Sequence, residues 1–153
     1  MLRVAKRFGL VDRMTPAGIT RDRRATWASA DEAYAHFHNK RAFRNFDPEC
    51  LRDYVTLGMR PSPEGVRLAF DPSIEYRIYR TFPHGIAQHL PSLRVPAGFI
   101  FGRESEDARN MGLATTRKFF RVARVEGGHL FPFEHPRAAA RAIAEMSEAL
   151  TAR

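Results

Sequence analysis

The sequence of 153 residues has a single cysteine and no long apolar run. Cys50 alone cannot form an internal disulfide or a thiolate pair for a metal, which fits a reducing compartment. The longest apolar stretch covers residues 95–101, whereas a helix that spans a bilayer needs about 20 residues. The charged first residues also lack the apolar core of a signal peptide. We therefore expect a soluble, cytoplasmic protein without a membrane span.

Lysine is also scarce. Only Lys6, Lys40 and Lys118 are lysines, so 22 of the 25 basic residues are arginines, against 17 acidic residues and a net charge of +8. The arginines are spread along the chain among acidic residues, and no run of like charges forms a basic arm. This pattern argues against nucleic-acid binding. A basic binding module that uses dispersed arginines on phosphate groups stays as an alternative.

Residues 1–92 carry several short helix patterns. The hydrophobic content of 44% and charged content of 27% are ordinary for a globular domain. Each predicted helix begins with a capping residue, followed by apolar side chains at helical spacing. The helices are expected over residues 31–46, with Ser29 or Asp31 as cap, and after Asp47 and Asp71, with a short extended segment over residues 66–70. We expect a small helical, cap-like region.

Residues 93–153 have a different pattern, in which strands and helices alternate. Strands are expected over residues 95–101, buried on both faces, and 119–125, with helices over 106–116 and 136–152. The last helix has an apolar stripe of Ala139, Ile143, Met146 and Leu150. Two parallel strands do not make an independent sheet. We therefore expect another segment, or an oligomer partner, to complete it.

One histidine follows the second strand in a distinctive setting. Gly127 and Gly128 allow a sharp turn, and His129 follows before Pro136 opens the last helix. A ring at the carboxyl end of a parallel strand can act as a general base. A histidine satisfied by backbone groups in a tight turn is the structural alternative.

Together these segments resemble the C-terminal portion of an α/β-hydrolase. Val95-Pro96 through Gly102 resembles the strand before the catalytic acid, and residues 127–136 resemble the catalytic-histidine segment. The resemblance implies a partial α/β-hydrolase fold, with residues 1–92 as cap-like region and residues 93–153 as the end of the core. It also implies ester-type hydrolysis of a small molecule with His129 as general base. Epoxides, amides, halides and C–C bonds are substrates of the same scaffold.

The sequence departs from this family at the nucleophile. None of the six serines has glycine at both the second position before and the second position after it, so no G-x-S-x-G elbow is present. Cys50 and the aspartates do not fit the variant elbows. We expect the nucleophile-bearing N-terminal half to be absent and the chain to be inactive by itself. A pseudoenzyme is the further alternative.

The resemblance places the catalytic acid after Gly102. Ser105 stands where the family often has aspartate, so Glu106 is the preferred orienting carboxylate, with Asp107 and Glu104 as neighbours. Glu106 and Asp107 also stand where acids stabilise the start of the next helix. An acid from the missing half is the other alternative.

The remaining candidates are weaker. His36 and His38 fall on different helix faces, which argues against a metal pair, and neither a metal nor a cofactor is expected. His84 and His89 flank a turn. Glu134 and Arg137 are expected to cap or solvate the last helix. The aromatic residues could line an apolar pocket or belong to an ordinary core; they are Trp27, Phe37, Tyr76, Tyr79 and Phe82.

Overall fold

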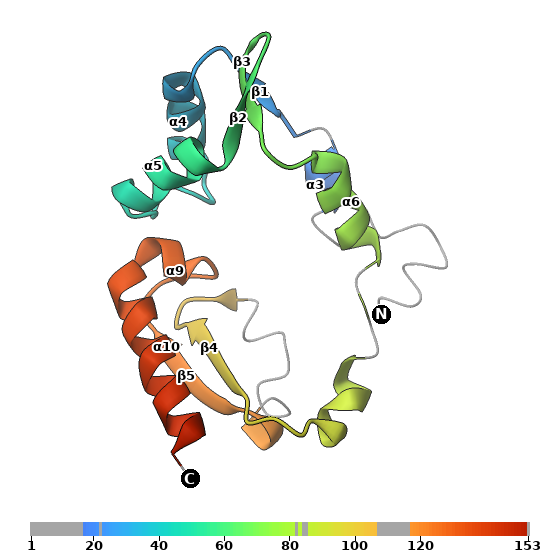
Figure 1. Ribbon diagram of the computed structural model, residues 1–153, viewed down its shortest axis with the longest axis vertical. Helices are drawn as coiled ribbons and strands as arrows, with labels where there is room; N and C mark the ends of the chain where they lie inside the picture. The colour runs from blue at the N-terminus through green and yellow to red at the C-terminus, as the bar shows by residue number, and fades with distance from the viewer. Residues whose placement is uncertain (1–16, 22, 82, 84–85, 107–116, 153) are drawn as a thin grey trace. The chain divides into compact units, whose positions relative to one another are not determined.

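The computed structural model describes residues 17–21, 23–81, 83, 86–106 and 117–152 (Figure 1). The chain forms two compact units. The first comprises Met1–His36 and Asp53–His89, and the second comprises Phe37–Arg52 and Leu90–Arg153. No helix in the described ranges is long and apolar enough to cross a membrane. Helices together with an antiparallel and a parallel sheet confirm the predicted α/β class.

The first unit contains a small antiparallel sheet. Its strands β1 (Thr26–Trp27), β2 (Met59–Ser62) and β3 (Gly65–Leu68) lie in the order β1-β3-β2. The sequence predicted only the β3 segment. Gly65, with φ of +124°, begins β3 after the β2–β3 turn, in a conformation that favours glycine. Trp27 and Leu68 are almost completely buried and belong to the core of this unit.

Side-chain caps begin the helices as the sequence predicted. The Glu32 N–H donates to Ser29 Oγ at the start of α4 (Ala30–His38). Asp47 accepts from the Glu49 N–H at α5 (Pro48–Leu57), and Asp71 accepts from the Ser73 N–H at α6 (Pro72–Thr81). Helix α3 (Ala17–Arg21) lies against α6, and the 3-10 helix η1 (Ile86–Ser92) follows α6 in the chain.

Helix α4 is shorter than predicted, because it ends at His38 rather than Phe46. The following residues form tight turns, in which the N–H groups of Lys40, Phe43 and Phe46 each donate to the carbonyl three residues earlier. These turns bring the rings of Phe37, Phe43 and Phe46 together, with successive centroids 4.9 and 5.0 Å apart. The aromatic spacing that suggested a longer helix therefore belongs to a series of turns.

The second unit contains the predicted parallel strands. Strand β4 (Gly98–Gly102) pairs with β5 (Arg121–Val125) in parallel, with Gly102 opposite Val125. The short helix α9 (Phe131–Glu134) and the long helix α10 (Pro136–Thr151) follow, and α10 lies along both strands (Figure 1). Helix α9 is absent from the sequence prediction.

The two faces of the parallel sheet differ. Ile100 packs on the cluster of Val125, Phe131 and Ala139, so this face meets α10. Successive side chains alternate between faces, so Phe99, Phe101 and Arg124 lie on the opposite face. There the rings of Phe99 and Phe101 are 5.9 Å apart, and the Arg124 guanidinium lies over the Phe101 ring. The opposite face is therefore also apolar in part.

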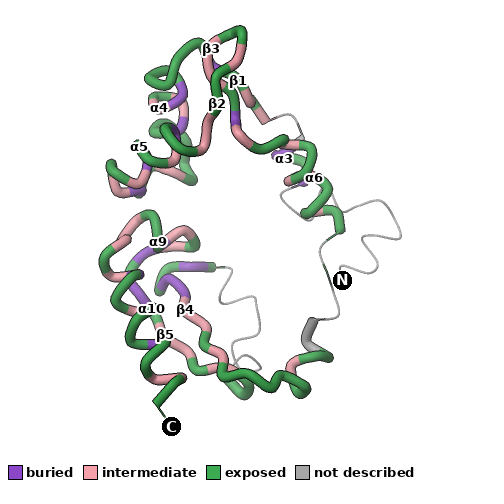
Figure 2. The backbone as a smooth tube through the Cα atoms, in the orientation of Figure 1, coloured by how far each residue is buried: buried purple, intermediate pink, exposed green. Residues whose placement is uncertain are grey.

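Burial in this sheet is uneven, which corrects two expectations. Residues at the carboxyl ends of β4 and β5 are buried, whereas their first residues are exposed (Figure 2). Val95 is 64% exposed and lies outside β4, so the predicted strand is not buried throughout. Ile143 is 58% exposed, because α10 turns Ala139 and Met146 inward instead. The predicted helix over 106–116 lies outside the described residues, except for Glu106.

Candidate active site

The candidate site lies where β4 and β5 end. Because these strands are parallel and in register, the segments after them begin side by side. We call residues 103–106 the acid loop and residues 126–130 the histidine loop. The acid loop carries Glu106 and the histidine loop carries His129, the two residues that the sequence assigned to catalysis. Sheets of this kind bind ligands at the carboxyl ends of their strands.

Backbone hydrogen bonds join the two loops. The Arg103 N–H donates to the Val125 carbonyl over 2.8 Å, and the Glu104 N–H donates to the Gly127 carbonyl over 3.0 Å. The Ser105 N–H donates to the Gly102 carbonyl and closes the turn of the acid loop, where Ser105 is buried. These bonds extend the strand pairing beyond the sheet and hold the two loops in one register.

Glycines make this close approach feasible. A Cβ atom on Gly102 would collide with the backbone carbonyls of Gly127 and Gly128. Gly127 has φ of +106°, which other residues rarely adopt. The sequence predicted a sharp turn at the two glycines of the histidine loop, which is confirmed. It did not predict that Gly102, on the neighbouring strand, is needed for the same contact.

His129 and Glu106 line the same hollow, of about 560 Å³. Both are exposed, as groups that meet a substrate must be. Glu104, Ser105, Gly128 and Leu130 line it from the two loops, and residues 41, 42, 44 and 45 line it from a third segment. The structure thus brings a candidate general base and a carboxylate to one site. Of the two neighbouring carboxylates considered, Glu104 lines the hollow, and Asp107 lies outside the described residues.

The third segment was missed by the sequence analysis. Phe46 stacks on Phe133 of α9 with ring centroids 5.0 Å apart and planes 6° from parallel. Beside them the Asp47 N–H donates to the Phe133 carbonyl over 2.8 Å. These contacts fix residues 41–45 beside the histidine loop. Arg41 and Arg44 thereby reach the hollow, although nothing in their local sequence indicates it.

Glu134 differs from its predicted role. It was expected to cap or solvate the last helix, but its carboxylate accepts the Gly128 N–H over 2.7 Å. His135 occupies the N-cap position of α10 and makes no side-chain cap there. Glu134 is half-buried and lines the hollow that contains His129. The sequence did not indicate this contact between residues six positions apart, because the short helix α9 that turns Glu134 back toward Gly128 was not predicted.

His135, which directly follows Glu134, lies close to the histidine loop. Its Cδ2 atom lies only 2.9 Å from the position of a Cβ on Gly127, so the ring packs against the histidine loop. It does not line the hollow of His129, but a separate one with Asp47, Glu49 and Arg52. His129 remains the only histidine among the described residues that line the first hollow.

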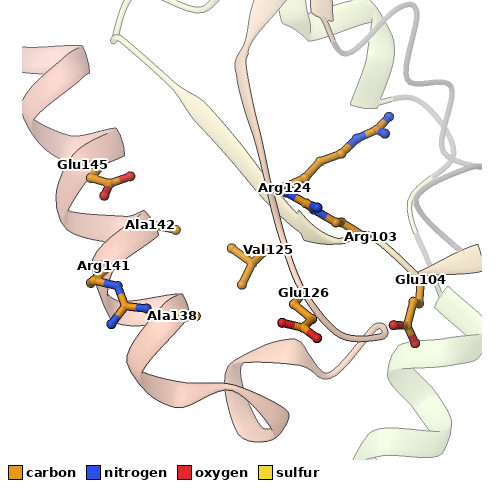
Figure 3. Close-up of a pocket in the computed structure, with 9 residues that line it drawn as sticks. All are labelled: Arg103, Glu104, Arg124, Val125, Glu126, Ala138, Arg141, Ala142 and Glu145. Carbon is orange, nitrogen blue, oxygen red and sulfur yellow. The ribbon is translucent and has the colours of Figure 1, made fainter.

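Another hollow lies between the end of β5 and α10 (Figure 3). Val125, Ala138 and Ala142 form its apolar part. Three arginines and three glutamates surround it, namely Arg103, Arg124, Arg141, Glu104, Glu126 and Glu145. Neither His129 nor Glu106 lines this hollow, and its charges of both signs favour no particular ligand.

The weaker candidates fall into ordinary structural places. Trp27 and Phe37 are buried, which favours a core role over a pocket. His36 lies beside the Trp27 ring with centroids 5.4 Å apart, and His89 is hydrogen-bonded to Gln88. Phe82 and His84 lie outside the described residues, and Arg137 is exposed. No cluster of potential metal ligands occurs among the residues that the structure describes.

Comparison with known proteins gives one kind of match. No protein-family profile and no curated protein sequence matches the chain. The structure is similar to the crystal structure of an E-2-(acetamidomethylene)succinate hydrolase, with a TM-score of 0.75 and 16% identity, over 90% of this chain and 52% of that chain. It is also similar to an M. tuberculosis esterase, with a TM-score of 0.67 and 19% identity, over 95% and 49% of the two chains.

A third match decides the fold. A peroxisomal alpha-beta-hydrolase from Saccharomyces cerevisiae aligns with a TM-score of 0.67 and 18% identity, over 83% of this chain and 37% of that chain. This chain has part of the α/β-hydrolase fold. It spans about half the length of the first two structures and a smaller share, 37%, of the third. The α/β-hydrolase resemblance and the partial fold predicted from the sequence are thereby confirmed.

Proposed function

We propose that this chain is the histidine-bearing part of an α/β-hydrolase that hydrolyses a small ester-like molecule. The observation that carries the proposal is the shared hollow of His129 and Glu106 at the ends of two adjacent parallel strands. A loop histidine and a carboxylate in this position are the two groups that activate a nucleophile in such hydrolases. The nucleophile itself comes from a segment that this sequence does not contain.

In this mechanism His129 moves a proton twice. Its ring accepts the proton of the nucleophile as the nucleophile attacks the ester carbonyl, and then donates it to the leaving alcohol. Water, deprotonated by the same ring, then attacks the acyl carbon of the covalent intermediate, and the ring returns this proton to the nucleophile as its bond to the acid breaks. Glu106 accepts a hydrogen bond from the other ring nitrogen and keeps the imidazole in the required tautomer. Glu104 lines the same hollow and is the alternative orienting carboxylate.

The sheet supports the need for a further segment. Phe99 and Val122 lie on the face opposite α10 and are only partly buried. A parallel sheet is normally covered on both faces. We propose that the segment with the nucleophile, on the same or another chain, pairs with β4 and covers this face. Residues 1–92 act in this arrangement as the cap-like region and residues 93–153 as the end of the core.

The test uses the chain joined to a nucleophile-bearing segment, from the upstream reading frame or from a similar hydrolase. We expect His129→Ala to lower kcat by at least roughly 10²-fold, with KM changed far less. His135→Ala is the matched control, since it removes an imidazole of the same region that does not line the hollow. Glu106→Gln is expected to cost less than His129→Ala if Glu104 can orient the ring.

Three outcomes contradict the proposal. Full turnover in His129→Ala, with loss in His135→Ala, would mean that the wrong histidine has been assigned. The chain without the added segment should react with no fluorophosphonate probe, because it lacks an elbow nucleophile. Stoichiometric labelling that a single Ser→Ala change abolishes would reveal a nucleophile within this sequence. Salt-dependent binding of nucleic acid by an inactive joined protein would favour the basic binding module instead.

A further inference from the structure

We propose that Glu134 is a positioning residue, whose carboxylate fixes the histidine loop and so holds His129 in place. This inference rests on the proposed role of His129 as general base. Glu134 acts through the Gly128 backbone rather than on a substrate. Its position is set by α9, so the inference links that helix to the orientation of the candidate catalytic ring.

The main contact is a short hydrogen bond. The Gly128 N–H, immediately before His129, donates to Glu134 Oε2 over 2.7 Å. A bond from a backbone amide to a carboxylate is stronger than one to a neutral acceptor. In return, the Phe131 N–H donates to the Gly128 carbonyl over 3.3 Å. The peptide groups on both sides of the Gly128 Cα are therefore held by groups of α9, and the backbone leading into His129 has little freedom.

The Glu134 carboxylate packs closely against Gly127 and Gly128. A Cβ on Gly127 would lie 2.7 Å from Glu134 Oε2 and 3.1 Å from the Cβ of Phe131. A Cβ on Gly128 would lie 3.2 Å from Glu134 Oε1. Both carboxylate oxygens thus pack closely on the two residues that precede His129. A side chain on Gly127 would force its neighbours to shift, and one on Gly128 would make a tight contact with the carboxylate, so the two glycines favour this approach.

Helix α9 is anchored from its other side. Phe133 stacks on Phe46, and its carbonyl accepts the Asp47 N–H. Glu134 follows directly, so its side chain projects from a fixed backbone. A negative charge at the carboxyl end of a helix gains nothing from the helix dipole. Its hydrogen bond to Gly128 accounts for a carboxylate at this place, whereas a role in stabilising α9 does not.

Amide hydrogen exchange of the full chain, followed by NMR, tests the bond without any activity. We expect Glu134→Ala to speed exchange at Gly128 by at least roughly tenfold, because a charge-assisted hydrogen bond is lost. Glu134→Gln keeps an acceptor and should retain most of the protection. Glu145→Ala is the matched control, since Glu145 is exposed on α10 and lines the other hollow (Figure 3).

Several results would overturn the proposal. One is an unchanged exchange rate at Gly128 in Glu134→Ala, and another is an unprotected Gly128 in the unmodified chain. If Glu134→Ala unfolds the chain, Glu134→Gln decides. A small loss of protection confined to Gly128 supports the bond, because an amide oxygen is a weaker acceptor than a carboxylate, whereas no change at Gly128, or an equal loss throughout the chain, overturns it.

Turnover of the joined enzyme tests the consequence for His129. We expect Glu134→Ala to lower kcat about tenfold with KM nearly unchanged, and Glu134→Gln to restore kcat to within about threefold of the unmodified value. A merely structural role would lower the fraction of active sites and leave kcat per active site intact, which would overturn the assignment. Failure of the proposed function appears separately, as normal turnover in His129→Ala, while the exchange result still decides the bond.

Discussion

The two compact units of this chain contain sheets of different kinds, antiparallel in the first and parallel in the second. In the first unit, α4 and α6 begin with caps from their own neighbouring residues, Ser29 and Asp71, and β1 pairs with β3 from a distant part of the chain. Its central hairpin joins β2 to β3 through a turn of two residues. In the second unit, the parallel strands and the two loops after them meet across about twenty residues of intervening chain.

The parallel pairing accounts for the position of the candidate site. Local caps and hairpins specify elements efficiently, but they bring together only residues that are already close in sequence. Parallel pairing of β4 and β5 brings Glu106 and His129 into one hollow from separate segments. The segment 41–45 reaches the same hollow through the stacking of Phe46 on Phe133. The candidate site is thus a product of long-range contacts.

The largest expected effect tests whether the first unit has a core of its own. Trp27 is 1% exposed, belongs to β1, and its ring lies 5.4 Å from the His36 ring of α4. We expect Trp27→Ala to lower the free energy of unfolding of this unit by about 3–5 kcal/mol. Amide exchange resolved by residue should show lost protection in β3 and retained protection in β5. Leu57→Ala, which truncates a side chain that is 77% exposed, is the control.

Equal loss of protection in β3 and β5 after Trp27→Ala would contradict the comparison, since the two units would then unfold as one. Loss that is confined to β3 would support separate cores.

Prediction from the sequence succeeded where the signal was local. The caps at Ser29, Asp47 and Asp71 follow from a polar residue before an apolar period, and the structure confirms all three. The two strands β4 and β5 were predicted from short apolar runs with glycine at or just after their ends. Their parallel pairing confirms the predicted α/β class. The location of His129 at a strand end was predicted for the same reason.

The parts that sequence reasoning missed depend on distant partners. Nothing in the local sequence distinguishes Glu134 from other acidic residues, and its contact with Gly128 depends on the short helix α9. Ile143 fits a helical stripe in sequence, yet the actual angle of α10 on the sheet leaves it 58% exposed. The strand β2 contains a proline and two polar residues and is recognisable only through its pairing with β3. Such contacts are set by packing, which periodicity does not encode.

A smaller effect separates the two glycines of β4. A Cβ on Gly102 would meet the backbone of Gly127 and Gly128, which cannot yield without moving the histidine loop. The three atoms nearest to a Cβ on Gly98 all belong to the flexible side chain of Met146. We expect Gly102→Ala to cost about 1–3 kcal/mol of stability in the second unit, and Gly98→Ala clearly less. Urea unfolding followed by circular dichroism and by loop resonances measures both.

Equal costs for the two substitutions would sink this assignment, because the loop contact would then be no tighter than an ordinary helix-to-sheet contact. A cost at Gly102 that also shifts the Gly128 and His129 resonances would sharpen it, by showing that the neighbouring strand helps to shape the histidine loop.

The smallest expected effect concerns a local cap in the first unit and its response to acid. Hydrogen bonds from the Ser73 backbone and side chain lower the pKa of Asp71 below its ordinary value. A carboxyl with a lowered pKa in the folded state stabilises that state above the pKa of the unfolded chain. The contribution is lost as the pH falls from about 4 through the folded-state pKa. Asp71→Ser keeps a cap that does not titrate.

We therefore expect α6 in the unmodified chain to lose protection against amide exchange as the pH falls below about 4, relative to Asp71→Ser. Exchange at Ser73 and Ile74, corrected for the intrinsic pH dependence of exchange, measures the difference. Identical pH dependence in the two proteins would show that the Asp71 charge contributes nothing to α6. The protection of Gly128, which depends on contacts of the second unit, should not change when Asp71 is replaced, because a cap acts only on its own helix.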